Sequence, residues 1–142
     1  MTPHAITQAI LADFGRGDVA AILARCHPDI EWEYGMTVEH DVPWYQQRRG
    51  REAAAGFFTS LADVTWHRFE PKRLLADGNL VVLLLDADYT VAATGRRVVY
   101  DDAVMLFWYD DAGRLVRFAH RVDMLPAFNA LQPEYDADVI RP

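Results

Sequence analysis

The spacing of apolar residues changes near residue 30, and this change limits what the chain can fold into. Ile6, Ile10 and Phe14 recur at four-residue intervals, which predicts one buried face of a helix. In residues 30–34, apolar and acidic residues alternate instead, which predicts a half-buried strand. A chain that changes period in this way has to pack helices against a sheet, so we expect an α+β fold.

Turn signals divide the rest of the chain into further elements. Thr2 and Pro3 mark the start of the first helix, and Gly15 and Gly17 mark its end. A second short helix should close near residues 26–28. Residues 36–49 have no clear period and are interpreted as a loop before a third helix over 52–62. Four strands should follow, over 64–75, 80–93, 98–109 and 115–123.

The order of elements is therefore helix, helix, strand, helix and a four-strand meander. Helices grouped before a meander favour a layer of helices on one face of an antiparallel sheet. The length of 142 residues fits one domain. We place that domain at residues 1–128 and interpret 129–142 as a C-terminal tail.

Composition excludes several classes of function. The net charge of −7 disfavours a nucleic-acid partner, and the apolar runs are far shorter than the roughly 20 residues that span a bilayer. The single cysteine excludes an internal disulfide and a multi-cysteine zinc site. The histidines show no metal-ligand spacing, and the sequence holds no glycine-rich phosphate loop or dinucleotide fingerprint. We therefore expect a cytoplasmic protein with no metal and no cofactor.

Four local strings follow one another in a recognisable order. They are the Gly17-Asp18 pair, PDIEWEYG at 28–35, GREAAAGFF at 50–58 and YDDAGRLVRFAHRVD at 109–123. In order and spacing they resemble the nuclear transport factor 2-like superfamily, and most of all its ketosteroid isomerases and SnoaL-like polyketide cyclases. The resemblance implies a cone-shaped, curved antiparallel sheet that wraps around the N-terminal helices and encloses a deep apolar pocket.

The resemblance also implies a homodimer, because members of the superfamily commonly pair through the outer face of the sheet. On this chain we expect that face to carry Trp66 or His67, together with Trp108 and Arg117. A paired interface of standard size would bury roughly 1,600 Å² in total.

The catalytic residues of the isomerases do not carry over. Their tyrosine falls at Ile10, their aspartate base at Tyr34 and their protonated aspartate at Met105. In the SnoaL-like cyclases, the base lies on the last strand at a position that falls on or near His120. Isomerase chemistry by the family mechanism is therefore not expected, and the cyclase position holds a different residue.

His120 is the first candidate for chemistry. Strand alternation puts it on one face with Val116, Phe118 and Val122, so it should point into the pocket. Histidine can act as a general base or acid near neutral pH. The alternative is a core histidine held by a backbone carbonyl or an acid. Asp101 and Asp102 are adjacent on the preceding strand, so one of them should face inward. The resemblance implies that Asp101 is the inward one and lies with Met105 on the concave face, where it could orient His120 or act as an acid itself. The alternative for Asp101 is an exposed strand end.

A set of aromatic side chains should line an adaptable cavity together with Met105. We also expect the hydroxyl of Tyr34 or Tyr89 to donate to a ligand carbonyl, although plain core packing is the alternative for the whole set. Trp44 and Tyr45, in the 36–49 loop, are interpreted as a lid, with loop anchoring or a dimer contact as alternatives. The predicted cavity aromatics are Trp32, Tyr34, Tyr89, Phe107, Phe118, Phe14, Phe58 and Trp44.

Two classes of function stay open. The first is an isomerase, cyclase or hydratase that acts on a small hydrophobic carbonyl compound, with His120 as the proton carrier and Asp101 and Tyr34 in supporting roles. The second is a non-catalytic domain that binds a small ligand or forms a dimeric interaction module, because a fold does not fix a function.

Overall fold

The computed structural model describes residues 1–34 and 41–132 of the chain. Helix α1 (Pro3–Gly15) begins where the Thr2 side chain accepts a hydrogen bond from the amide of Ala5. Helix α2 (Val19–Ala24) begins where the Asp18 side chain caps the amide of Ala21. These are the two caps that satisfy otherwise unpaired amides at a helix start.

Strand β1 (Cys26–Tyr34) begins earlier than the alternation predicted, so the expected helical end near residues 26–28 is wrong. The reason is a long-range bond: the amide of Leu115 donates to the carbonyl of Arg25 at 2.9 Å. This bond starts a parallel pairing in which Cys26 lies opposite Leu115. Extended backbone at Cys26 is thus stabilised by a distant strand.

The remaining elements are β2 (Arg48–Arg49), α3 (Arg51–Ser60), the 3₁₀ turn η1 (Leu61–Asp63), β3 (Val64–Asp77), β4 (Leu80–Val91), β5 (Arg96–Tyr109), β6 (Leu115–Arg121) and α4 (Leu125–Leu131). The six strands form one sheet in the order β2-β1-β6-β5-β4-β3. Neighbouring strands are antiparallel except for β1 and β6, which are parallel.

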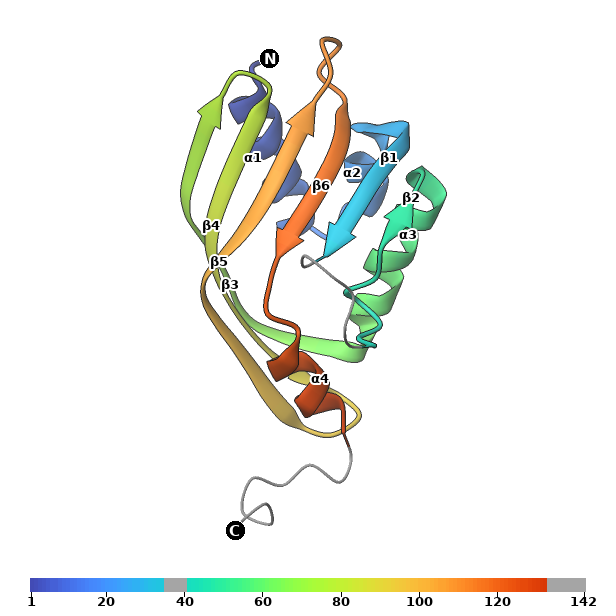
Figure 1. The fold of residues 1–142 in the computed structure, drawn as a ribbon, viewed down its shortest axis with the longest axis vertical. Helices are drawn as coiled ribbons and strands as arrows, with labels where there is room; N and C mark the ends of the chain where they lie inside the picture. The colour runs from blue at the N-terminus through green and yellow to red at the C-terminus, as the bar shows by residue number, and fades with distance from the viewer. Residues whose placement is uncertain (35–40, 133–142) are drawn as a thin grey trace.

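The predicted α+β fold is confirmed: a strongly curved, unclosed sheet carries α1, α2 and α3 on one side, and α4 lies near the end where β5 bends (Figure 1). The core fills the concave side, between the sheet and these three helices. Among the described residues, no helix is both long and apolar enough to cross a bilayer.

The predicted domain boundary at residue 128 falls inside α4. Ala127 and Ala130 of this helix are both buried, and the carbonyl of Ala130 accepts a hydrogen bond from the Thr94 hydroxyl. Helix α4 therefore packs on the domain through residues on both sides of that boundary. The part of the predicted tail at 133–142 lies outside the described residues.

Candidate ligand pocket

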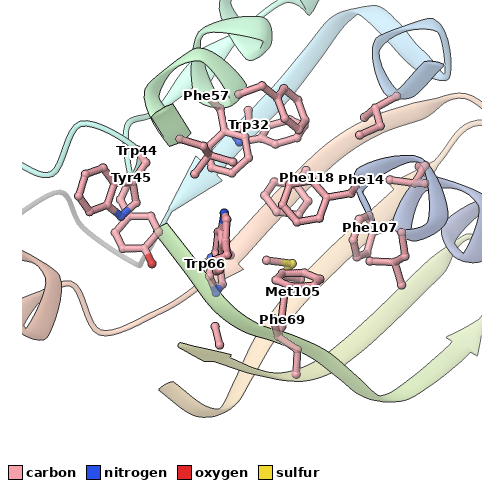
Figure 2. Close-up of a pocket in the computed structure, with 18 of the residues that line it drawn as sticks. Phe14, Trp32, Trp44, Tyr45, Phe57, Trp66, Phe69, Met105, Phe107 and Phe118 are labelled. Atoms are coloured by element: carbon pink, nitrogen blue, oxygen red, sulfur yellow. The ribbon is translucent and has the colours of Figure 1, made fainter. Parts of the chain in front are cut away.

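The concave side of the sheet holds a cavity of about 70 Å³ between the strands, α1 and α3 (Figure 2). Its wall is almost wholly apolar and rich in aromatic rings. The lining residues that the sequence had singled out are Phe14, Trp32, Trp44, Phe58, Tyr89, Met105, Phe107, Phe118 and His120.

The strand pairing explains why these side chains meet. Across the sheet, Tyr34 of β1 lies opposite His120 of β6, which lies opposite Met105 of β5. Residues opposite one another on neighbouring strands share a face, so the three side chains point to the same side. A second row, two residues along, holds Trp32, Phe118 and Phe107.

His120 is buried, with 5% of its surface exposed. Its Nε2 atom has no hydrogen-bond partner among the described residues. Its ring meets the rings of Tyr34 and Tyr45 edge to face, with centroids at 5.8 and 5.7 Å. Desolvation lowers the pKa of the imidazole from 6.5 to about 3, so the ring is neutral at physiological pH.

Asp101 does not share the concave face, and this corrects the sequence-based expectation. Between Leu85 and Ala87 the pairing of β4 with β5 shifts register, so β5 carries an extra residue there. The extra residue reverses the alternation, and Asp101 is exposed. Asp102 beside it takes the left-handed conformation, φ 54°, while its amide donates to Asp86 Oδ1 at 3.0 Å.

Tyr34 is completely buried beside His120. Its hydroxyl accepts a hydrogen bond from the indole nitrogen of Trp32 at 2.9 Å. Burial raises the pKa of the Tyr34 phenol well above its ordinary value, so the phenol stays protonated. Tyr34 therefore contacts the candidate histidine from behind, while Trp32 and His120 face the cavity.

Trp44 and Tyr45 close one end of the cavity. They are 1% and 5% exposed, and both bond to one hydroxyl. The Trp44 indole nitrogen donates to the Tyr89 oxygen at 3.0 Å, and the hydroxyls of Tyr45 and Tyr89 lie 3.2 Å apart. The indole of Trp44 and the hydroxyls of Tyr45 and Tyr89, which lie far apart in the sequence, thus form one buried hydrogen-bond network at this end. The sequence is compatible with a lid, with loop anchoring and with a dimer contact for Trp44 and Tyr45. These buried hydrogen bonds favour the interpretation that both side chains anchor the loop to the domain.

Of the two alternatives for the outer face, Trp66 or His67, the structure excludes Trp66, which lies on the inner face of the sheet, whereas His67 is exposed. The Trp66 ring contacts Phe14, Phe69 and Tyr89 at centroid distances of 6.2, 5.7 and 5.3 Å. A register shift between Trp66 and Arg68 turns Trp66 and Phe69, three residues apart, toward the same side. The alternation of apolar and polar residues in this strand does not reveal the bulge, so the sequence alone could not place Trp66 on the inner face.

Two other wall residues belong to α3 and β3. Phe57 and Phe69 line the cavity, although sequence reasoning had not placed them there. Phe57 packs on Trp32 at 5.4 Å and on Tyr34 at 5.7 Å. The signal for Phe57 lies in the helical spacing of Ala54, Phe57, Phe58 and Leu61, which predicts one buried side of the third helix.

The described residues contain no group of three His, Cys, Asp or Glu side chains placed to hold a metal ion. Cys26 is buried, and burial raises the pKa of its thiol to about 11, which makes it a poor nucleophile. The polar side-chain atoms of the described lining residues are the imidazole nitrogens of His120, the hydroxyls of Tyr45 and Tyr89, and the indole nitrogens of Trp32, Trp44 and Trp66.

Sequence and structure comparisons agree on the same family. Residues 7–118 match the SnoaL-like domain. No curated protein gives a significant match.

Three solved structures illustrate the similarity. A nuclear transport factor 2-like protein from Burkholderia thailandensis is 26% identical, with a TM-score of 0.77 over 94% of this chain and 99% of its own. A candidate SnoaL-like polyketide cyclase from Mesorhizobium loti is 22% identical, with a TM-score of 0.69 over 86% and 100%. A candidate isomerase from Bacillus subtilis is 17% identical, with a TM-score of 0.75 over 95% and 99%.

Proposed function

The chain belongs to the SnoaL-like domain family, and on this premise we propose that its pocket binds a small, uncharged carbonyl compound on which His120 moves a proton. The reactions that begin in this way are isomerisation, aldol-type cyclisation, dehydration and hydration. Relatives that are candidate cyclases and isomerases support this range of reactions.

One observation carries the proposal: His120 lines an apolar cavity, and its Nε2 atom is buried without a hydrogen-bond partner among the described residues. A buried polar atom without a hydrogen bond costs about 1–3 kcal/mol. A ligand with one hydroxyl or carbonyl group removes this cost when it binds. The pocket therefore favours a molecule that is mostly apolar but carries one polar group.

The ligand should be uncharged. The described residues that line the cavity include no Lys, Arg, Asp or Glu side chain. The imidazole is neutral, because desolvation lowers its pKa to about 3. A carboxylate or an ammonium group would lose its hydration there without gaining a counter-charge.

The low pKa also limits the chemistry. A weakly basic imidazole removes a proton only from a carbon that is already acidic, such as one next to a carbonyl group. The electrons that remain move onto the carbonyl oxygen and form an enolate. The hydroxyls of Tyr89 and Tyr45, which keep their protons because burial raises their pKa values, are the donors that could stabilise that oxygen.

The volume of the cavity limits the size of the ligand. A cavity of about 70 Å³ is smaller than the roughly 150 Å³ engineered cavity that accommodates benzene. A ring-sized ligand must therefore displace side chains. Phe57, Phe58 and Met105 line the cavity and are only partly buried, so they are the side chains we expect to move.

Binding can be tested with three probes of similar size: 4-fluorophenol, fluorobenzene and 4-fluorobenzoate. Fluorine NMR measures how tightly each of them binds. The phenol resembles an enol and should bind about tenfold more tightly than fluorobenzene, the gain from about one hydrogen bond. In His120→Phe this advantage should vanish, and in His120→Gln it should persist in part. Tighter binding of the benzoate, or no binding of the phenol, would contradict the proposal.

Catalysis needs a separate assay. The exchange of the α-protons of 2-indanone in deuterium oxide reports proton removal next to a carbonyl. Wild-type protein should accelerate this exchange, and His120→Gln should lower the rate by roughly 10²–10⁴-fold without unfolding the protein. If the probes bind but wild-type and variant exchange rates are equal, the chain is a non-catalytic ligand-binding domain.

We further propose that the chain is a homodimer paired through the outer face of the sheet. Leu84, Leu106 and Trp108 are only partly buried there. Arg117 stacks on the Trp108 ring at 4.0 Å and binds both Glu33 oxygens at 3.0–3.1 Å, which holds a flat, mixed surface in place. The cytoplasmic location stays a prediction from the sequence.

A further inference from the structure

The wall of the pocket is sealed at one end and partly open at the other. At the sealed end, Trp44, Tyr45 and His120 are each 5% exposed or less. At the open end lie Trp66, which is 36% exposed, and the partly buried Phe14 and Leu61. The open end is where α1, η1 and the edge strand β3 meet.

Trp66 lies in the pocket wall at this open end. The centroid of its ring lies 6.2 Å from that of the partly buried Phe14 and 5.3 Å from that of the buried Tyr89. The Trp66 ring thus reaches from the exposed end of the pocket wall to the Tyr89 hydroxyl network.

The Trp66 indole is held less firmly than the two indoles at the sealed end and centre of the pocket. Trp32 and Trp44 donate their indole hydrogens to the hydroxyls of Tyr34 and Tyr89. The Trp66 indole has ring contacts but no hydrogen bond to a described residue. It also lies on an edge strand next to a register shift, where the ladder is locally interrupted.

We propose that Trp66 is the entrance residue of the pocket and that its ring sets the width of the molecule that can enter between α1 and β3. The ring swings outward to admit a flat, narrow ligand and then returns against it. This inference rests on the proposed function for the identity of the ligand, but the position of the entrance can be tested without any ligand.

The test places a thiol in the wall and measures how fast a small neutral reagent reaches it. Ala87 lines the cavity, is 4% exposed and is a small residue, so Ala87→Cys adds one sulfur atom facing the cavity. Its thiolate attacks methyl methanethiolsulfonate, forms a methyl disulfide and releases methanesulfinate. The native Cys26 is buried with a pKa raised to about 11, so its background labelling should be slow.

In the Ala87→Cys background, Trp66→Ala should accelerate labelling at least about tenfold, because it removes three ring contacts that hold the entrance closed. Trp66→Phe should give an intermediate rate. The matched control is Trp44→Phe, which removes the bond to Tyr89 at the sealed end and should leave the rate within about twofold of the parent. Low concentrations of urea should not change any of these rates, which separates entrance opening from global unfolding.

Equal labelling of Trp66→Ala and its parent would overturn the proposal, as would a larger acceleration in Trp44→Phe. A second readout uses 4-fluorophenol: Trp66→Ala should raise the association and dissociation rates together and leave the preference over fluorobenzene intact. If wild-type protein does not bind the phenol, the proposed function fails, while the labelling experiment still decides where the entrance lies.

Discussion

Acid should destabilise the fold through His120 at pH values where most carboxylates are still ionised. The folded protein keeps this imidazole neutral, with a pKa of about 3, whereas the unfolded chain has the ordinary value of 6.5. Between these values the unfolded state binds a proton that the folded state does not. Stability is therefore highest above pH 6.5 and falls as the pH drops from 6.5 toward 3.

The size of the effect follows from the two pKa values. At pH 5 the unfolded chain has bound nearly the whole proton, and the free energy of unfolding should be lower by about 2 kcal/mol than at pH 8. The full loss across the window is about 5 kcal/mol, a large part of the stability of a small domain. The two described phenols whose rings contact His120, those of Tyr34 and Tyr45, do not titrate in this pH range. They stay protonated, because burial raises both pKa values.

The assay is urea unfolding at pH 8, 6 and 5 for wild-type protein and for two variants that cannot titrate at this position, His120→Phe and His120→Gln. The difference between wild type and each variant isolates His120, because the other ionisable groups contribute equally to all three proteins. Wild type should lose about 2 kcal/mol more than either variant between pH 8 and pH 5. Parallel pH profiles would show that His120 is solvated or paired, and the argument for an unpartnered Nε2 would fall with it.

Three further changes test other parts of the structure. Tyr89→Phe removes the shared partner of Trp44 and Tyr45 and should lower the free energy of unfolding by about 1–3 kcal/mol in urea titrations. Asp102→Val should cost about 1–2 kcal/mol because φ there is 54°, whereas Asp102→Asn should be nearly neutral, and a cost as large for Asn would refute the backbone explanation. Trp108→Glu should convert a dimer in light scattering into a 16.2 kDa monomer, and a wild type that is already monomeric at micromolar concentrations would end the dimer proposal.

The pattern of the sequence was sufficient for most of the longer helices and strands and for much of the pocket wall, but it did not predict β2 or α4. Alternation alone puts Trp32 and Tyr34 on one face of β1, and Phe118 and His120 on one face of β6, as the structure has them. These placements follow from local geometry, because a strand sends successive side chains to opposite faces wherever it lies. The same holds for the capped helix start at Thr2.

Alternation failed where the sheet carries extra residues. The register shift beside Asp86 puts Asp101 on the outside, and the shift after Trp66 puts that ring on the inside. A bulge depends on how two strands pair, so neither strand reports it alone. For this reason alternation did not reveal that Asp101 is too exposed to pair with His120, or that Trp66 lies in the pocket wall.

By itself, then, the sequence determined the order of helices and strands and the inward direction of Phe118 and His120, since both depend on contacts a few residues apart. Only the tertiary structure decided that β1 pairs in parallel with β6 and brings Tyr34 against His120, and that Trp44 and Tyr45 share one hydroxyl. It also decided that His120 lines an apolar cavity and that its Nε2 atom has no partner among the described residues. These contacts join residues 44 to 86 positions apart, and their energies depend on burial that exists only after the sheet has curved around the helices.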